Sequence, residues 1–220
     1  MKPVKFSSTL LEVRQLTPTV KHLVFSTPSG FSFLPGQYIS LILTAGDKKI
    51  RRLYSIASKP GGGTIELCIK IINGGVATPI IDKLVKGDTV EFLGPLGEFV
   101  IKDSSKERDL VFIATGTGVA PFRSMVLELL EKGHDKKITL IGGYRSYALY
   151  EELKELEKEY PQFNYKTLLS PQRVQGVLPE ISIENTNFYI CGLKEMVNSV
   201  REILVQRGVP MNAIHSEKYD

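Results

Sequence analysis

Apolar and β-favouring residues cluster in short stretches along the first half of the chain, separated by segments rich in Gly, Pro and Asp. Four stretches have the composition of strands: 36–44, 52–58, 64–72 and 88–99. Several short strands at this spacing predict a small antiparallel β-barrel. One helix is predicted among them, over residues 78–85. Thr78 is its expected N-cap, Pro79 its first residue, and Gly87 follows its end.

Strand and helix patterns alternate along the second half. Strands are predicted at 110–115, 137–143, 163–170 and 188–191, and helices at 121–132, 148–160 and 194–208. Gly133 and Gly208 mark the ends of two of these helices. This alternation predicts a parallel, doubly wound, Rossmann-like sheet, so the fold class is β followed by α/β. The charged segment 102–109 separates a predicted domain of residues 1–103 from one of residues 108–220.

Composition narrows the classes of function. Hydrophobic residues make up 42% and charged residues 24% of the chain, as is typical of a globular protein with a packed core. No apolar run approaches the ~20 residues that span a membrane. Residues 1–10 hold no apolar segment of the kind that a secretory signal needs. We therefore expect a cytoplasmic protein whose partners include neither membrane nor nucleic acid.

Cysteine and histidine are few and scattered. Cys68 and Cys191 cannot build a disulfide framework, nor an iron–sulfur cluster, which usually takes four cysteines. His22, His134 and His215 lack the spacing of metal ligands. We expect no metal site.

Positive charge is concentrated in the first half. Residues 1–105 hold 13 Lys and Arg against 8 Asp and Glu, whereas the whole chain has a net charge of +4. Either this asymmetry arises by chance, or the first half meets an acidic partner.

Two glycine-containing segments have the character of phosphate-binding loops. ATGTGVAP (114–121) follows a predicted strand and opens a helix, so its backbone could approach a dinucleotide closely. KIINGGVATPI (70–80) places a Gly pair before a helix start, where the N–H groups of residues 76–78 could bind a pyrophosphate. Arg52 could add a guanidinium suited to phosphate oxygens. A plain tight turn and a hairpin exit are the alternatives for the two segments.

Six motifs follow one another along the chain. They are RLYSIAS (52–58), GGVAT (74–78), GPLGEF (94–99), GTGVAPFRS (116–124), CG (191–192) and EKYD (217–220). In this order they resemble the ferredoxin–NADP reductase family of flavoproteins, and the resemblance covers nearly the whole chain. It implies a flavin-binding barrel followed by a NAD(P)-binding domain, with FAD as the flavin and NADPH or NADH as the nucleotide.

In the barrel, the resemblance implies that Arg52 holds the flavin phosphate and Tyr54 stacks on the isoalloxazine ring. It implies that Ser55 hydrogen-bonds the flavin nitrogen that receives hydride, with Leu53 in the same cofactor-binding segment. The implied pyrophosphate cradle consists of Gly75, Val76, Ala77 and Thr78.

In the second domain, the resemblance implies a set of nucleotide contacts. These are Thr115, Gly116, Thr117, Gly118 and Arg145. Cys191 and Gly192 are implied where the nicotinamide ring docks. Glu217 and Tyr219 match the plant-type ending E-x-Y, in which the glutamate joins Ser55 and Cys191 in the catalytic constellation and the aromatic ring covers the flavin until nicotinamide displaces it. Without the resemblance, Cys191 reads as a small buried residue at a strand end, and the last residues as a frayed tail.

The chain departs from the plant-type pattern in three respects. Asp220 follows the terminal tyrosine, and no obvious loop clamps the adenine half of FAD, which leaves FMN as an alternative. The segment expected to contact the nucleotide 2′-phosphate is SPQRVQG (170–176), where Ser170 and Arg173 could bind that phosphate. The choice between NADPH and NADH stays open.

The predicted function is that of an NAD(P)H-dependent flavin oxidoreductase exchanging single electrons with a separate acidic carrier, ferredoxin or flavodoxin. The basic first half favours such a carrier through electrostatic steering. Arg51 is interpreted as a solvated or partner-facing charge. Two alternatives are an enzyme that uses free flavin as its substrate, and an electron-transfer subunit of a larger complex.

Overall fold

The computed structural model describes residues 2–219, apart from the side chain of Ser104. The chain forms two compact units that divide between Val100 and Ile101. Each unit has its own sheet and its own hydrophobic core, and each is described by itself.

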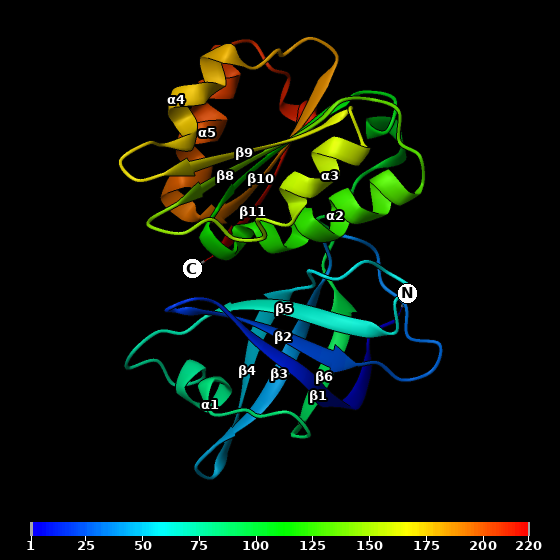
Figure 1. Cartoon of the computed structure of the whole chain (residues 1–220), viewed down its shortest axis with the longest axis vertical. Coiled ribbons are helices and arrows are strands. Elements are labelled where there is room, and N and C mark those ends of the chain that lie inside the picture. Colours follow the sequence, from blue (N-terminus) through cyan, green and yellow to red (C-terminus); the bar gives the residue numbers. More distant parts are fainter. Residues whose placement is uncertain (1, 220) are drawn as a thin grey trace. The chain divides into compact units, whose positions relative to one another are not determined.

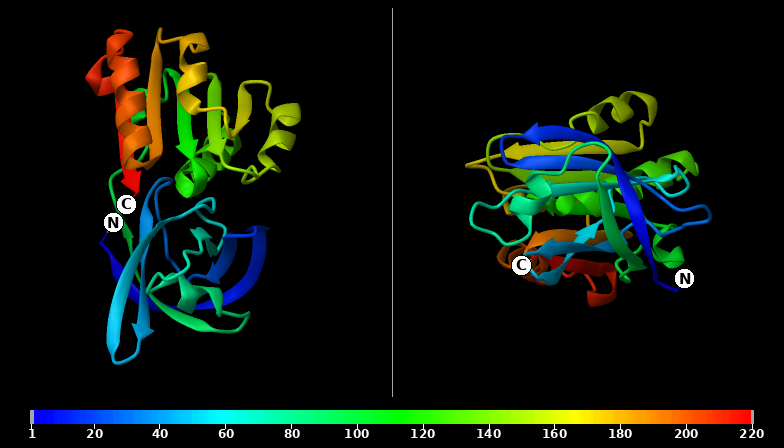
Figure 2. Two further views of the ribbon diagram at one scale, coloured as in Figure 1. Left: turned by 90° about the vertical axis from the view of Figure 1, so that its left-hand side faces the viewer. Right: turned by 90° about the horizontal axis from the view of Figure 1, so that it is seen from below.

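The first unit is built on six antiparallel strands. They are β1 (Val4–Thr17), β2 (Val20–Ser26), β3 (Tyr38–Ala45), β4 (Lys48–Ser55), β5 (Thr64–Lys70) and β6 (Thr89–Leu96). Their order in the sheet is β4-β3-β6-β1-β2-β5 (Figure 1). The sheet curls (Figure 2), and its two edges meet where Ile56 bridges Leu67 and the Ala57 N–H donates to the Glu66 carbonyl at 2.8 Å. The predicted antiparallel barrel is confirmed.

Strands β1 and β2 were not apparent from the sequence. The residues of β1 read FSSTLLEVRQLT from Phe6, and their apolar and polar positions do not alternate cleanly. The strand changes partner along its length, pairing with β6 at one end and β2 at the other. Its register against β2 shifts between Leu10 and Glu12, and again between Gln15 and Thr17. At each bulge, the side chains that follow switch from one face of the sheet to the other. The alternation of apolar and polar residues along the strand is therefore lost.

The barrel interior is filled by aliphatic and aromatic side chains from all six strands. Leu10, Phe25, Ile39, Leu67 and Phe92 are among the fully buried ones. The rings of Phe25 and Phe92 meet edge to face, with centroids 5.0 Å apart. Each such side chain contributes about 1.5–3 kcal/mol through burial.

Helix α1 (Thr78–Asp82) is shorter than the predicted helix over 78–85. The prediction that Thr78 is the N-cap is wrong, because the N-cap is Ala77. The Thr78 hydroxyl instead accepts a hydrogen bond from the Ile72 N–H at 3.1 Å and donates one to the Ile72 carbonyl at 2.9 Å. These bonds close the loop that precedes the helix.

The second unit contains a five-stranded parallel sheet. Its strands are β7 (Asp109–Thr115), β8 (Ile138–Tyr144), β9 (Phe163–Leu169), β10 (Thr186–Leu193) and β11 (Ile214–Tyr219). Their order is β11-β10-β7-β8-β9, so the chain reverses direction across the sheet between β7 and β10. The predicted doubly wound fold is confirmed.

Helices lie on both faces of this sheet (Figure 1). They are α2 (Ala120–Glu131), α3 (Leu153–Glu159), α4 (Val174–Val177) and α5 (Lys194–Gln206). Single turns of 3₁₀ helix occur at Asp103–Ser105, Gly116–Val119, Leu178–Glu180 and Met211–Ala213. On the α4–α5 side, Val174, Val197 and Leu204 pack against Ile113 and Ile190 of the central strands.

One local prediction for this unit is wrong, and one alternative is excluded. The helix expected over 148–160 begins only at Leu153, because Tyr150 has a positive φ of 57°, which a helix cannot accommodate. The alternative that Glu217 and Tyr219 belong to a frayed tail is excluded, because β11 pairs in parallel with β10 along six residue positions. Gly133 and Gly208, with φ of 70° and 89°, end their helices as predicted.

Two general features bear on function. No helix within residues 2–219 is long and apolar enough to cross a membrane. Over the same residues, no group of three or more His, Cys, Asp and Glu side chains is placed to hold a metal ion.

Candidate functional site: a flavin segment and a nucleotide edge

The predicted flavin segment lies at the end of β4. Strand β3 aligns it, with Tyr38 opposite Ser55 and Ile39 opposite Tyr54. The Arg52 side chain is exposed, and its guanidinium donates to the Arg51 carbonyl at 2.8 Å. Ser55 is buried. The strand therefore presents a fixed cation beside a half-buried aromatic ring.

Tyr54 packs against the barrel core. Burial raises its pKa to about 12, and the nearby Arg52 charge only partly opposes this rise. The phenol is consequently neutral at physiological pH. Its ring is held by the core on one side and can serve as a stacking platform for an aromatic ligand.

The glycine loop before α1 fits a phosphate group. A Cβ on Gly75 would lie 2.9 Å from the Thr78 Oγ1 and 3.2 Å from the Ile72 carbonyl oxygen, so the turn leaves little room for a side chain. Gly74 has a φ of 78°, which also favours glycine. The backbone N–H groups at 76–78 donate to no acceptor within residues 2–219. A run of such donors is the kind of concave site that binds anions.

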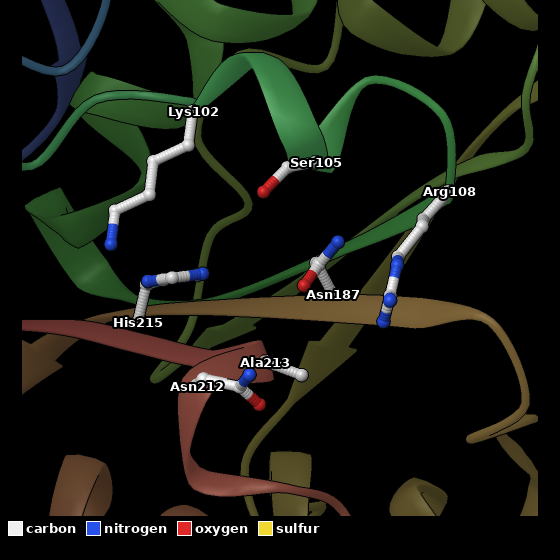
Figure 3. Close-up of a pocket in the computed structure, with 7 residues that line it drawn as sticks. All are labelled: Lys102, Ser105, Arg108, Asn187, Asn212, Ala213 and His215. Atoms are coloured by element: carbon white, nitrogen blue, oxygen red, sulfur yellow. The ribbon is translucent and has the colours of Figure 1, made fainter.

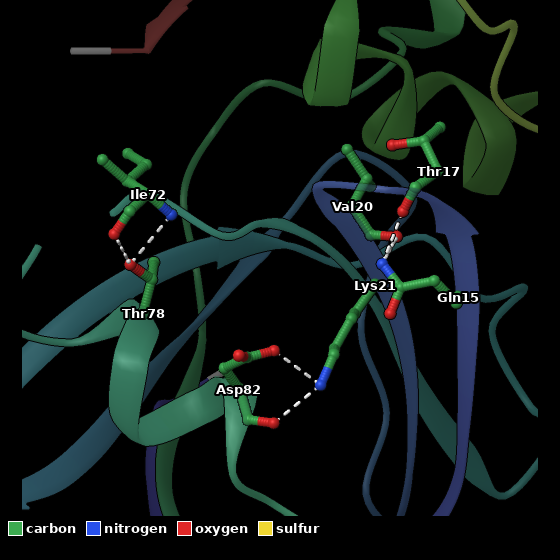
Figure 4. Close-up of polar contacts among 7 residues, drawn as sticks. All are labelled: Gln15, Thr17, Val20, Lys21, Ile72, Thr78 and Asp82. Carbon is green, nitrogen blue, oxygen red and sulfur yellow. Dashed lines mark hydrogen bonds and ion pairs between the residues drawn. The ribbon is translucent and has the colours of Figure 1, made fainter. Parts of the chain in front are cut away.

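Helix α1 is fastened to the barrel at both ends (Figure 4). At its start, Thr78 bonds to Ile72. At its end, the Lys21 ammonium of β2 lies 2.7 Å from the Asp82 carboxylate and 2.6 Å from the Asp82 carbonyl oxygen. The Lys21 side chain is only 15% exposed, so this ion pair is partly shielded from solvent. The two attachments fix the orientation of the glycine loop.

The predicted nucleotide residues gather at the carboxyl edge of the parallel sheet. Open α/β sheets bind ligands at this edge, where the strand order reverses. Thr115 ends β7 and leads into the turn Gly116–Val119. Cys191 and Gly192 lie near the end of β10, the strand beside β7. Sequence-distant motifs are thus brought side by side.

Three backbones meet closely at this edge. A Cβ on Gly118 would lie 2.4 Å from the Cys191 carbonyl oxygen, so only glycine fits there. A Cβ on Gly192 would lie 2.4 Å from the Thr115 Oγ1 and 2.9 Å from the Met196 Cε. The Thr115 hydroxyl is buried and has no hydrogen-bond partner within the described chain. A buried hydroxyl of this kind suits a polar group on a bound nucleotide.

Cys191, Glu217 and Tyr219 come together through strand pairing. In the β10–β11 register, Cys191 lies opposite Glu217, and Leu193 lies opposite Tyr219. Cys191 is fully buried. Burial raises the pKa of its thiol far above its usual value, the Glu217 charge raises it further, and a hydrogen bond with Tyr219 opposes both only in part. The group is therefore a neutral thiol, able to donate a weak hydrogen bond but not to act as a nucleophile.

Three other predicted contacts are exposed and lie on loops that follow neighbouring strands. Arg145 follows β8, whereas Ser170 and Arg173 follow β9. The Ser170 N–H donates to the Tyr144 carbonyl at 3.0 Å, which joins the two loops. The placement matches a surface that contacts the outer part of a nucleotide.

Sequence reasoning missed several residues that shape these surfaces. Tyr38 packs so closely on Gly97 that a Cβ there would lie 2.8 Å from the ring. Met196 contacts the position of Gly192, and Val174 contacts that of Gly143. The glycines of the GPLGEF and CG motifs indicate that another part of the chain approaches closely. They do not identify the side chain that approaches.

A β-barrel with a glycine loop before a short helix, followed by a doubly wound parallel sheet with glycines at its carboxyl edge, is the organisation of a two-domain flavoprotein oxidoreductase. Residues 7–101 match the oxidoreductase FAD-binding domain family, and residues 112–202 match the oxidoreductase NAD-binding domain family. The chain belongs to the ferredoxin–NADP reductase family.

Relatives of established name support this membership. Ferredoxin–NADP reductase B of Sorangium cellulosum is 32% identical, and the match covers 98% of each chain. The reductase component of phenol 2-monooxygenase from a Pseudomonas species is 33% identical over 93% of this chain. That match covers only 62% of the relative, so this chain spans about three fifths of the oxygenase reductase.

Solved structures give the same fold. An Amycolatopsis cytochrome P450 reductase superposes with a TM-score of 0.87 at 25% identity, covering 98% of this chain and 70% of that one. A ferredoxin–NADP+ reductase mutant of Plasmodium falciparum gives a TM-score of 0.87 at 24% identity, covering 98% and 96%. The chain is accordingly an NAD(P)H-dependent flavin oxidoreductase with FAD as its cofactor.

Proposed function

We propose that the chain exchanges electrons with a separate acidic redox protein, a ferredoxin or flavodoxin. The observation that carries the proposal is the exposed basic strand β4, where Lys48, Lys49 and Arg51 precede the proposed flavin ligand Arg52. Lys49 is neutralised by Glu91, but Lys48 and Arg51 form no ion pair within residues 2–219. Free surface cations of this kind accelerate association with an acidic partner. The name of the Sorangium relative agrees with this choice.

We further propose the roles of the barrel residues, taking residues 1–103 as the flavin domain. Arg52 binds the flavin phosphate, Leu53 and Tyr54 flank the ring, and Ser55 hydrogen-bonds it. The pyrophosphate lies on the N–H groups of the loop Gly75–Thr78. These residues would hold and orient FAD, which when bound would supply the hydride-accepting and one-electron chemistry.

In the nucleotide domain, taken as residues 108–220, the close packing at the carboxyl edge of the sheet supports the proposed roles. Gly118 and Gly192 let the nicotinamide nucleotide approach the backbone, and the Thr115 hydroxyl supplies a hydrogen bond. Arg145, Gly116 and Thr117 contact its phosphates and ribose. Cys191, Glu217 and Tyr219 form the polar set around the nicotinamide. Asp220 lies outside the described residues.

We propose NADPH as the preferred nucleotide, with Ser170 and Arg173 as its 2′-phosphate site. Both side chains are exposed beyond β9. Arg173→Gln should raise KM for NADPH about tenfold or more, because a charge-assisted hydrogen bond is lost. KM for NADH should stay unchanged. Equal effects on the two nucleotides would contradict a 2′-phosphate role.

The test of the whole proposal combines a spectrum with a salt titration. The purified protein should be yellow and should be bleached anaerobically by NADPH. Reduction of ferredoxin should fall as ionic strength rises, and Lys48→Gln with Arg51→Gln should flatten that dependence. Lys166→Gln, on β9 of the other unit, is the matched control. Salt-independent ferredoxin reduction would refute the acidic-partner proposal.

A second candidate is the electron-transfer component of a larger complex, favoured by the similarity to the phenol 2-monooxygenase reductase. Co-purification with a stable partner and no ferredoxin activity alone would support it. The free-flavin alternative predicts a colourless protein that reduces added flavin. We propose a cytoplasmic location, consistent with Cys68 and Cys191 being buried thiols.

A further inference from the structure

The amino edge of the parallel sheet, opposite the proposed nucleotide edge, contains a small polar cavity (Figure 3). It lies where three adjacent strands begin: β7, β10 and β11. Its volume is about 90 Å³, which is enough for water molecules or a small ion. The lining residues are Lys102, Ser105, Arg108, Asn187, Asn212, Ala213 and His215.

The charged residues of this lining are all positive. Lys102 and Arg108 are both cationic, and none of the seven residues is acidic. Neither cation forms an ion pair with a carboxylate of residues 2–219. Of the acids near them along the chain, Asp103 pairs with Lys106, Asp109 accepts the Lys137 N–H, and the exposed Glu107 is not part of the lining. Two cations beside one cavity repel each other, and a bound anion would offset that repulsion.

The neutral members of the lining are hydrogen-bond donors held in place. Asn187 is 5% exposed, and it lines the cavity. The Ser105 hydroxyl accepts a hydrogen bond from the buried Tyr189 at 3.0 Å, so its own proton is free to donate. The ring of His215 stacks on that of Tyr189, with centroids 4.5 Å apart. In Figure 3 Lys102 and Arg108 lie on opposite sides of the lining, with Ser105 and Asn187 between them and His215 near the Lys102 ammonium.

We propose that this cavity binds a small tetrahedral oxyanion of the phosphate class. Lys102 and Arg108 supply the charge, and Asn187, Ser105 and His215 supply donors from three further directions. The several N–H donors of Arg and the amide of Asn match the multiple acceptor oxygens of such an ion, and size excludes a nucleotide. The site is separate from the nucleotide edge, because the strands that form both are parallel and their two ends lie at opposite edges of the sheet.

The test uses the FAD-loaded protein with NADP+ present, titrated with inorganic phosphate at ionic strength held constant with chloride. The side-chain amide signal of Asn187 should shift in NMR spectra, and the melting temperature should rise as the folded state binds ligand. Arg108→Gln and Lys102→Gln should each weaken phosphate binding about tenfold or more. Lys158→Gln, an equal loss of charge on exposed α3, should leave it unchanged.

The outcomes separate this site from the proposed nucleotide site. Loss of phosphate binding in Arg173→Gln, with Arg108→Gln unaffected, would place the anion at the nucleotide edge and overturn the inference. Absence of any Asn187 shift in the unmodified protein would also overturn it. If Arg108→Gln does not fold, Arg108→Lys keeps the charge but not the planar fork and should bind more weakly than the unmodified protein. Failure of ferredoxin reduction has no bearing on these results.

Discussion

The two units present their candidate residues in opposite ways. In the barrel, Arg52 and the loop before α1 are exposed, and they touch little beyond their own segment. In the α/β unit, Gly118, Cys191 and Gly192 are in a packed junction where backbone meets backbone. The flavin side can therefore lose a ligand contact without losing stability. On the nucleotide side, binding and packing depend on the same atoms.

The largest effect is expected at Gly118. Gly118→Ala would force a Cβ against the Cys191 carbonyl, at a cost of about 1–3 kcal/mol in the free energy of unfolding. Displacement of the strand end should reduce the rate of flavin reduction by NADPH about 100-fold, since a shift near 1 Å can have that effect. Stopped-flow absorbance and thermal unfolding measure the two effects.

The matched control for this substitution is Gly176→Ala. A Cβ at Gly176 would meet no atom within 4 Å, and its φ lies outside the positive region. Both rate and stability should stay at the level of the unmodified protein. If Gly118→Ala behaved like this control, the close approach at the nucleotide edge would have no functional role.

The next effect tests the barrel. Arg52→Gln should weaken FAD binding about tenfold or more, because a charge-assisted contact to phosphate is lost. The melting temperature of the FAD-free protein should be unchanged, since within residues 2–219 the guanidinium donates to the carbonyl of the adjacent Arg51. Arg51→Gln removes the same charge one residue earlier and should leave FAD affinity intact. Equal losses in both variants would indicate a general charge effect.

A smaller effect is expected from the attachment of α1. Lys21→Met removes the ion pair with Asp82 and should weaken FAD binding about two- to tenfold by loosening the glycine loop. Lys83→Met, on the exposed end of the same helix, is the control. Quenching of FAD fluorescence on binding gives both affinities. A larger loss in Lys83→Met than in Lys21→Met would rule out the positioning role of Lys21.

Local sequence patterns predicted most of the candidate residues in both units. They did not predict the long-range packing that brings these residues together. The RLYSIAS and GTGVAP motifs could be located from the sequence, because their glycine, arginine and tyrosine residues form recognisable local patterns. Strand β1 was missed because bulges break its alternation. The early start predicted for α3 ignored the positive φ of Tyr150, which an apolar pattern cannot reveal. The cavity joins Lys102, Asn187 and His215, which become neighbours only through the order β11-β10-β7.

The smallest effect distinguishes the two units by their pH dependence. In the α/β unit, burial lowers the pKa of His215, and the Lys102 charge lowers it further. The unfolded chain then binds a proton at a pH where the folded chain does not, so stability falls as pH drops below about 6.5. In the barrel, hydrogen bonds from Lys49 and Lys5 lower the pKa of Glu91 to about 2. Its contribution is present above its unfolded pKa and is lost only as pH falls from about 4.5 towards 2.

Thermal unfolding of two variants across this pH range separates these contributions. His215→Gln should make the protein less sensitive to pH between 6.5 and the folded pKa of His215, and should not change its behaviour near pH 4. Glu91→Gln should show the reverse, with its difference from the unmodified protein shrinking only below pH 4.5. If the two substitutions changed stability over the same pH range, these groups would not explain a difference in acid sensitivity between the two units. Phosphate in the amino-edge cavity would favour protonated His215 and so raise its pKa in the folded state. The pH range over which His215 affects stability should therefore narrow when phosphate is added. This result would link the comparison to the proposed anion site.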